Sequence, residues 1–89
     1  MEIAFSKSFK KAFDKRVRGE AAEVTFWEQL ELFVEDPYNF NLKTHKLSGK
    51  LKDLWSFSVA YDLRVVFYIT KEKPPKAVFI DIGSHDEVY

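Results

Sequence analysis

The chain contains no cysteine, and this absence constrains how its 89 residues can fold. Neither a disulfide nor a thiolate metal site can stabilise the fold, so the packing of its side chains alone must do so. A chain of this size buries only about 60 to 65% of the surface of its unfolded state, which leaves room for one core. We therefore expect a single domain that spans residues 1–89.

Aromatic residues supply this core with large apolar area, because nine Phe, four Tyr and two Trp make up 17% of the chain. The hydrophobic share of 46% and the charged share of 31% are typical of a globular protein and exclude a disordered tail. No apolar run reaches the roughly 18 residues of a membrane helix, and the start MEIAFSKSFKK lacks the apolar stretch of a signal peptide. We expect a soluble, unexported protein, and the cytoplasm fits a cysteine-free chain best.

Hydrophobic periodicity predicts a strand and then two helices in the first part of the chain. Residues 1–5 show a period of two. Apolar spacings of three and four then indicate a helix from Ser6, a suitable N-cap, to Gly19, a suitable C-cap. A second helical period covers residues 20–35 and stops before Pro37. The two helices should form a hairpin.

Three strands are predicted in the remainder. Residues 55–61 alternate between apolar and polar side chains, and residues 63–70 are rich in β-branched and aromatic types. The sequence KEKPPK at 71–76 is a turn, and residues 77–82 form the third strand. Strands with such short connections pair antiparallel. The predicted class is α+β in the order β-α-α-β-β-β, with a two-helix hairpin packed on one face of a small antiparallel sheet.

The segment 37–53 is the longest stretch without clear periodicity, and we interpret it as a charged loop. Its charged residues and its histidine are Lys43, His45, Lys46, Lys50, Lys52 and Asp53. The second face of the sheet is expected to be partly solvated. Our hypothesis is that this loop, the turn at Tyr61-Asp62 and the C-terminal segment converge there around one concavity.

The formal net charge is zero, with 14 basic and 14 acidic residues, so no overall field indicates nucleic acid. The charges are nevertheless segregated, because the first helix is basic and the second is acidic. Mutual pairing and solubility are one interpretation of this pattern. The other is a cationic face for phosphates or for an acidic protein.

Residues able to perform acid-base chemistry are few. His45 and His85 are the two histidines, the residue type whose ordinary pKa lies nearest neutrality. There is no His-x-x-x-His pair, cysteine cluster, carboxylate array or glycine-rich phosphate loop, so we expect neither a metal nor a cofactor.

This inventory permits metal-free cleavage of RNA, in which the ribose 2′-OH attacks the adjacent phosphorus. The reaction needs a base, an acid and a fixed cation near the phosphate oxygens. Arg64 is the only arginine outside the first helix, and a guanidinium can bind two phosphate oxygens at once. The alternative is a structural strand arginine paired with Asp62 or Asp81.

Three segments carry a family resemblance: HKLSG at 45–49, DLRVVFYI at 62–69 and IGSHDEVY at 82–89. Together they resemble the RelE/ParE superfamily, the toxin half of type II toxin-antitoxin pairs. The YafQ-like branch is the most similar, with its H-x-L-x-G loop, its aspartate opening the central strand and its terminal G-T/S-H followed by an aromatic. The resemblance covers nearly the whole chain and implies a RelE-like microbial ribonuclease fold.

The resemblance implies a ribosome-dependent mRNA endonuclease that inhibits translation and is held inactive by a cognate antitoxin. Its partners would be the antitoxin, the ribosome and mRNA, with no membrane. By position, His85 would be the main acid-base residue, His45 and Asp62 would assist in proton transfer or orientation, and Tyr89 would stack on a base. Arg64 lies where RelE and YoeB relatives carry a transition-state arginine. From charge placement we add phosphate contacts by Lys43, Lys46, Lys50 and Lys52.

Two positions depart from the YafQ pattern. Ser58 stands in place of a second catalytic histidine, and Leu63 stands in place of a tryptophan. Three alternatives remain open: a ParE-like inhibitor of DNA gyrase, a non-catalytic family member that only binds an antitoxin, and an interaction domain that uses the charge dipole of the helix hairpin.

Overall fold

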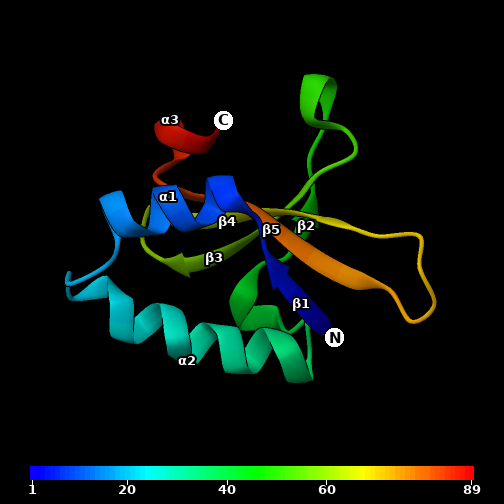
Figure 1. The fold of residues 1–89 in the computed structure, drawn as a ribbon, viewed down its shortest axis with the longest axis horizontal. Helices are drawn as coiled ribbons and strands as arrows, with labels where there is room; N and C mark the ends of the chain where they lie inside the picture. The colour runs from blue at the N-terminus through cyan, green and yellow to red at the C-terminus, as the bar shows by residue number, and fades with distance from the viewer.

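A computed structural model describes all residues from 1 to 89. The elements are β1 (Glu2–Phe5), α1 (Lys7–Arg16), α2 (Ala22–Glu35), η1 (Phe40–Leu42), β2 (His45–Lys46), η2 (Gly49–Leu51), β3 (Trp55–Ala60), β4 (Leu63–Ile69), β5 (Lys76–Gly83) and α3 (His85–Val88). The five strands form one sheet in the order β1-β5-β4-β3-β2, an α+β architecture as predicted (Figure 1).

The helix hairpin is present, and α1 and α2 run in opposite directions (Figure 1). The side chain of Ser6 caps α1 by accepting a hydrogen bond from the backbone N–H of Phe9. The helix ends at Arg16, earlier than predicted, and Gly19 with φ of 80° lies in the connection rather than in the cap. None of the helices combines the length and the apolar character needed to cross a bilayer.

The sheet is mixed, so the prediction of a wholly antiparallel sheet is wrong for its first strand. The meander β3-β4-β5 is antiparallel, whereas β1 pairs parallel to β5 with Ile3 opposite Ala77. The rule that gives antiparallel pairing applies to strands joined by short turns. The chain between β1 and β5 passes through both helices, so that rule did not constrain it.

Four short elements were not predicted, η1, β2, η2 and α3, and two of them bear on the pocket. The strand β2 lies inside the supposed loop and pairs with β3, with His45 opposite Ser56. The helix α3 follows β5 and is stabilised by a capping box between Ser84 and Glu87. Elements of two and four residues are too short for periodicity to reveal. The S-x-x-E pattern at 84–87 was the available signal for α3.

Both helices cover the same face of the sheet. Alternate strand residues face the helices, and the buried cluster joins them to Phe9, Phe13 and Val17 of α1 and to Phe26, Leu30 and Phe33 of α2. Phe79 of β5 lies within this cluster and is fully buried. Its ring centroid is 5.5 to 6.0 Å from those of Phe5, Phe9, Phe33, Phe57 and Phe67.

No ion pair joins the two helices, so the interpretation of their charges as mutual pairing is wrong. Arg18, just beyond α1, pairs with Asp14 of α1, and Arg16 pairs with residues outside the hairpin. Aromatic rings make the contact between the helices, for example Phe13 with Phe26 at 5.1 Å. The contact between α1 and α2 is therefore aromatic, and the charged residues Lys10, Asp14, Arg18 and Glu23 line a hollow beside it.

We predict that Phe79→Ala lowers the free energy of unfolding by about 3 to 5 kcal/mol, because it removes a ring that contacts five others. Urea denaturation followed by circular dichroism measures this change. The control is Phe40→Ala, since Phe40 is 89% exposed and should change stability by less than about 0.5 kcal/mol. Equal effects of the two substitutions would contradict this description of the core.

Candidate functional site

A pocket of about 440 Å³ opens on the face of the sheet opposite the helices. Its lining residues are Lys43, His45, Ser56, Ser58, Ala60, Tyr61, Asp62 and Arg64. Ser56 and Ser58 alternate along β3 with the core residues Phe57 and Val59, so they lie on the other face. The structure brings the segment before β3 and the β3–β4 turn together, as our hypothesis required.

The β3–β4 turn places Asp62 and Arg64 at this pocket. Asp62 has a φ of 54°, a left-handed conformation that aspartate tolerates better than most residues. Arg64 Nη1 donates to Asp62 Oδ1 at 3.1 Å, which is one of the two pairings considered for this arginine. The other possible partner, Asp81, is paired with Arg16. The pair with Asp62 holds the guanidinium at the pocket, and 31% of the Arg64 side chain is exposed.

Asp62 also connects the pocket to the C-terminal segment. The backbone N–H of His85 donates to the same Oδ1 at 3.0 Å. This hydrogen bond is the main reason why the pKa of Asp62 lies below the ordinary value of 3.8. Desolvation raises the pKa by less than this hydrogen bond lowers it, and the contacts with Arg64 lower the pKa further. At neutral pH Asp62 is therefore a carboxylate that accepts hydrogen bonds and orients its neighbours.

The ring of Tyr89 lies between His85 and Arg64. The centroids of the Tyr89 and His85 rings are 4.6 Å apart at an interplanar angle of 84°, and the Arg64 guanidinium carbon lies 5.9 Å from the Tyr89 centroid. The Tyr89 hydroxyl donates to Ser56 Oγ at 2.6 Å. The imidazole of His85 itself is open to solvent, with 59% of the side chain exposed. The imidazole and the guanidinium thus meet the same aromatic ring.

His45 of β2 is oriented by a backbone carbonyl. Its Nδ1 lies 2.8 Å from the carbonyl oxygen of Lys43. A carbonyl can only accept, so Nδ1 carries the hydrogen and Nε2 keeps its lone pair in the neutral ring. Lys43 has a φ of 52°, which is part of the local turn before β2. In this tautomer Nε2 is the nitrogen able to accept a proton, and His45 is one of the residues that line the pocket.

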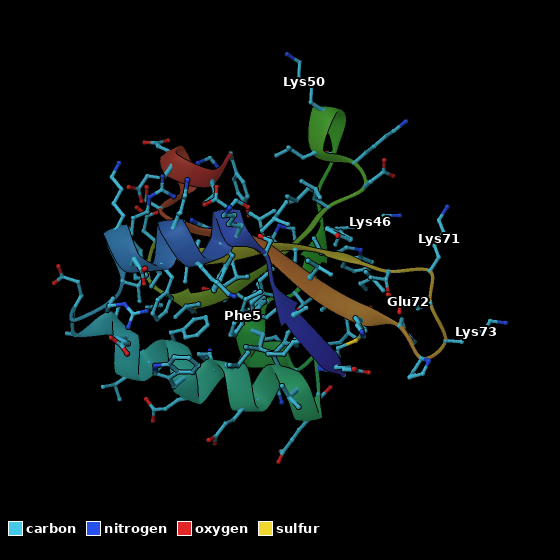
Figure 2. All side chains as sticks on the ribbon, viewed as in Figure 1. Phe5, Lys46, Lys50, Lys71, Glu72 and Lys73 are labelled. Carbon is cyan, nitrogen blue, oxygen red and sulfur yellow. The ribbon has the colours of Figure 1, made fainter.

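The structure does not gather all four predicted lysines at the pocket. Lys43 lines it. Lys46 lines a separate hollow, with its Nζ 6.0 Å from the ring centroid of Trp55. Lys50 projects from the tip of η2, away from the body of the protein, and Lys52 is exposed just beyond η2 (Figure 2). The basic loop is divided because β2 anchors its middle to the sheet.

One functional residue of the pocket was missed by the sequence reasoning. Ser56 was expected on the solvated face, but it is fully buried and is the partner of Tyr89. Tyr61 lies in the predicted turn after β3: the strand ends at Ala60, and Tyr61 is fully exposed. No group of three histidine, aspartate or glutamate side chains is arranged to hold a metal ion.

Solved structures of toxins share this fold. Over 100% of this chain and 99% of the other, a metal-bound toxin from Helicobacter pylori is 29% identical with a TM-score of 0.74. YafQ from Escherichia coli is 17% identical with a TM-score of 0.80, covering 99% of this chain and 97% of its own. A YoeB/ParE toxin from Agrobacterium tumefaciens is 17% identical with a TM-score of 0.75, covering 96% and 99%. No curated protein sequence matches the chain.

These likenesses show that the chain has the fold of the YafQ and YoeB/ParE toxins. The family model described as the bacterial YafQ toxin of type II toxin-antitoxin systems matches residues 1–89. The chain belongs to this family, which confirms the resemblance seen in its sequence.

We predict that Asp62→Asn destabilises the protein at neutral pH and has a smaller effect in acid. The folded-state pKa of Asp62 is depressed, so its contribution is present above 3.8 and is lost as the pH falls through the folded value. Urea midpoints of the two proteins measured between about pH 6 and about pH 2.5 should converge at the low end. The control is Asp53→Asn, at an exposed carboxylate outside this network. A gap that stays constant with pH would contradict the assignment.

Proposed function

We propose that this toxin is an mRNA endonuclease that cleaves by attack of the ribose 2′-OH and thereby inhibits translation. The observation that supports it most is the meeting of the His85 imidazole and the Arg64 guanidinium at the ring of Tyr89, beside a pocket lined by His45. Two proton-transfer groups and a fixed cation are the parts that this reaction requires.

In this mechanism Nε2 of His45 takes the 2′-OH proton while the 2′-oxygen forms a bond to phosphorus. The bond from phosphorus to the 5′-oxygen breaks, and protonated His85 gives its proton to that leaving oxygen. Arg64 offsets the charge that develops on the equatorial phosphate oxygens. The products are a 2′,3′-cyclic phosphate and a 5′-hydroxyl. Asp62 orients His85 and Arg64, and Tyr89 offers its ring to a base of the substrate.

The proposed partners are the ribosome with its mRNA and a cognate antitoxin. Escherichia coli YafQ has been crystallised in a complex with DinJ, and the YafQ in that structure has a TM-score of 0.72 to this chain at 18% identity. A zero net charge gives weak general attraction to RNA, so recognition rests on local cations such as Lys43 and Arg64. The same cations would attract an acidic antitoxin segment placed over the pocket.

A second candidate is a family member that binds its antitoxin without cleaving RNA. Ser58 supports it, because a serine hydroxyl lines the pocket where the family pattern has a histidine, and its Oγ donates to the carbonyl of Ala60. Mapping of transcript 5′ ends after induction separates the two candidates. New ends inside reading frames indicate the nuclease, whereas intact transcripts and unimpaired growth indicate the member that only binds its antitoxin. Growth arrest with intact transcripts and inhibited supercoiling would indicate the remaining alternative, a gyrase inhibitor.

We predict that His85→Ala lowers the rate of RNA cleavage by about 10²- to 10⁴-fold and abolishes growth arrest, since it removes a proton-transfer group. Cleavage of mRNA on purified ribosomes measures the first effect. The matched control is Lys73→Ala in the exposed turn between β4 and β5, which should retain activity. The His85 side chain is 59% exposed, so the variant should remain folded. Full toxicity of folded His85→Ala protein would rule out this mechanism.

We predict that Arg64→Ala also lowers cleavage and that Arg64→Lys restores it only in part. Lysine keeps the charge but lacks the planar fork that holds two phosphate oxygens. Single-turnover rates on ribosome-bound mRNA measure the effect, and circular dichroism verifies folding. If both variants cleave at the wild-type rate, Arg64 has only the structural role of pairing with Asp62.

A further inference from the structure

The helix α3 carries His85 and is followed directly by Tyr89, but it has only four residues. A helix this short is unstable alone, because the entropy cost of ordering its first turn exceeds the free energy gained from the hydrogen bond of that turn. The positions of these two side chains therefore depend on anchors outside the segment. Two anchors lie on the pocket side: Asp62 accepts from the His85 N–H, and Ser56 accepts from the Tyr89 hydroxyl.

A third anchor is Arg16, the last residue of α1. Its Nη1 donates to Asp81 Oδ1 at 3.1 Å and to the carbonyl of Ile82 at 2.9 Å. Its Nε lies 3.4 Å from Glu87 Oε2 in α3. The Arg16 side chain is only 24% exposed. One guanidinium thus joins α1, β5 and α3, and α3 lies above α1 in the view of Figure 1.

The edge of β5 leaves room for this side chain. The strand β1 pairs with β5 only as far as Phe79, so the following residues have no neighbouring strand on that side. A Cβ on Gly83 would lie 2.8 Å from Arg16 Nη1 and 2.8 Å from Glu87 Oε1. The absence of a side chain at Gly83 is therefore what allows the arginine and the carboxylate to approach the backbone.

Glu87 is fixed from two sides. Its Oε1 accepts from the Ser84 N–H at 2.7 Å, and its backbone N–H donates to Ser84 Oγ at 3.3 Å. The pKa of Glu87 is lowered, first by the Ser84 N–H and also by the charge of Arg16, so the carboxylate is ionised at neutral pH. Arg16 Nε is enclosed without a well-directed hydrogen bond, so charge attraction is its link to Glu87.

We propose that Arg16 is a positioning residue that acts through Glu87 to hold α3, and with it His85 and Tyr89, in register with the pocket. The consequence for catalysis rests on the proposed nuclease function. The consequence for the C-terminal segment does not, because it concerns only where α3 lies. This difference allows the two proposals to fail separately.

The test compares the wild-type protein with the variants Arg16→Gln and Glu87→Gln, each made in the full chain. Arg18→Gln is the matched control. Gln at 87 keeps an acceptor for the capping box but removes the charge that attracts Arg16. Arg18 pairs with Asp14 and does not contact α3. In Arg16→Gln and Glu87→Gln, but not in Arg18→Gln, we expect faster amide hydrogen exchange at residues 85–89 and unchanged exchange in β4. We also expect the NMR chemical shifts of the His85 ring protons to change, because the Tyr89 ring would no longer lie against the imidazole.

For cleavage, we expect Arg16→Gln and Glu87→Gln to lower kcat by about 10- to 100-fold with KM little changed, because a displaced catalytic group slows chemistry more than binding. Arg16→Lys should recover part of the loss. Should Arg16→Gln prove unstable through its lost contact with Asp81, Glu87→Gln decides the matter, since it leaves that contact intact.

The possible outcomes have separate meanings. Unchanged exchange and unchanged His85 shifts in folded Glu87→Gln protein overturn the positioning role. Loosening of residues 85–89 together with undiminished kcat also overturns it, because α3 would then be held for stability alone. If the wild-type chain does not cleave RNA, the proposed function fails, and the exchange and NMR results decide whether Arg16 holds α3.

Discussion

The candidate site depends on one carboxylate oxygen, Oδ1 of Asp62. It accepts from the guanidinium of Arg64 in β4 and from the backbone N–H of His85 in the C-terminal segment. The two donor residues are 21 positions apart in the sequence, and both donate to the same oxygen atom. Because the His85 N–H and the arginine lower the pKa of this carboxyl, the charge that holds them persists through the neutral range.

The rest of the molecule provides a rigid support for that oxygen. The aromatic core fixes the helix-covered face, and the serines of β3 are thereby directed to the pocket face. The C-terminal segment is held from two sides, by the hydrogen bond of Tyr89 to Ser56 on the pocket side and by Arg16 through Glu87 on the side of α1. The side chains of Asp62 and His85 are exposed, so their positions have to be fixed by such hydrogen bonds and ion pairs rather than by burial.

The charge distribution separates two surfaces. The acidic residues of α2 form no ion pair with α1, and the cations near the pocket come from the segment before β3 and from β4. A neutral chain can therefore still present a local cationic pocket. This arrangement favours binding that is governed by a few positioned groups over binding governed by a long-range field.

The sequence alone determined the elements whose patterns are local. Ser6 as the N-cap, the hairpin of α1 and α2 and the meander of β3 to β5 all follow from periods and short turns, which repeat within ten residues or so. The resemblance also identified His85, Asp62, His45 and Tyr89 as candidates, since motif positions are readable without distances.

Only the tertiary structure decided which of these groups meet. The parallel pairing of β1 with β5 and the burial of Ser56 under Tyr89 depend on contacts between segments far apart in the chain. Arg16 seemed one basic residue among several in α1, and its link to Asp81 and Glu87 exists because the open edge of β5 lies beside the end of that helix. Local patterns encode which side chains share a face of one element, whereas the choice of a partner from another element is made by packing.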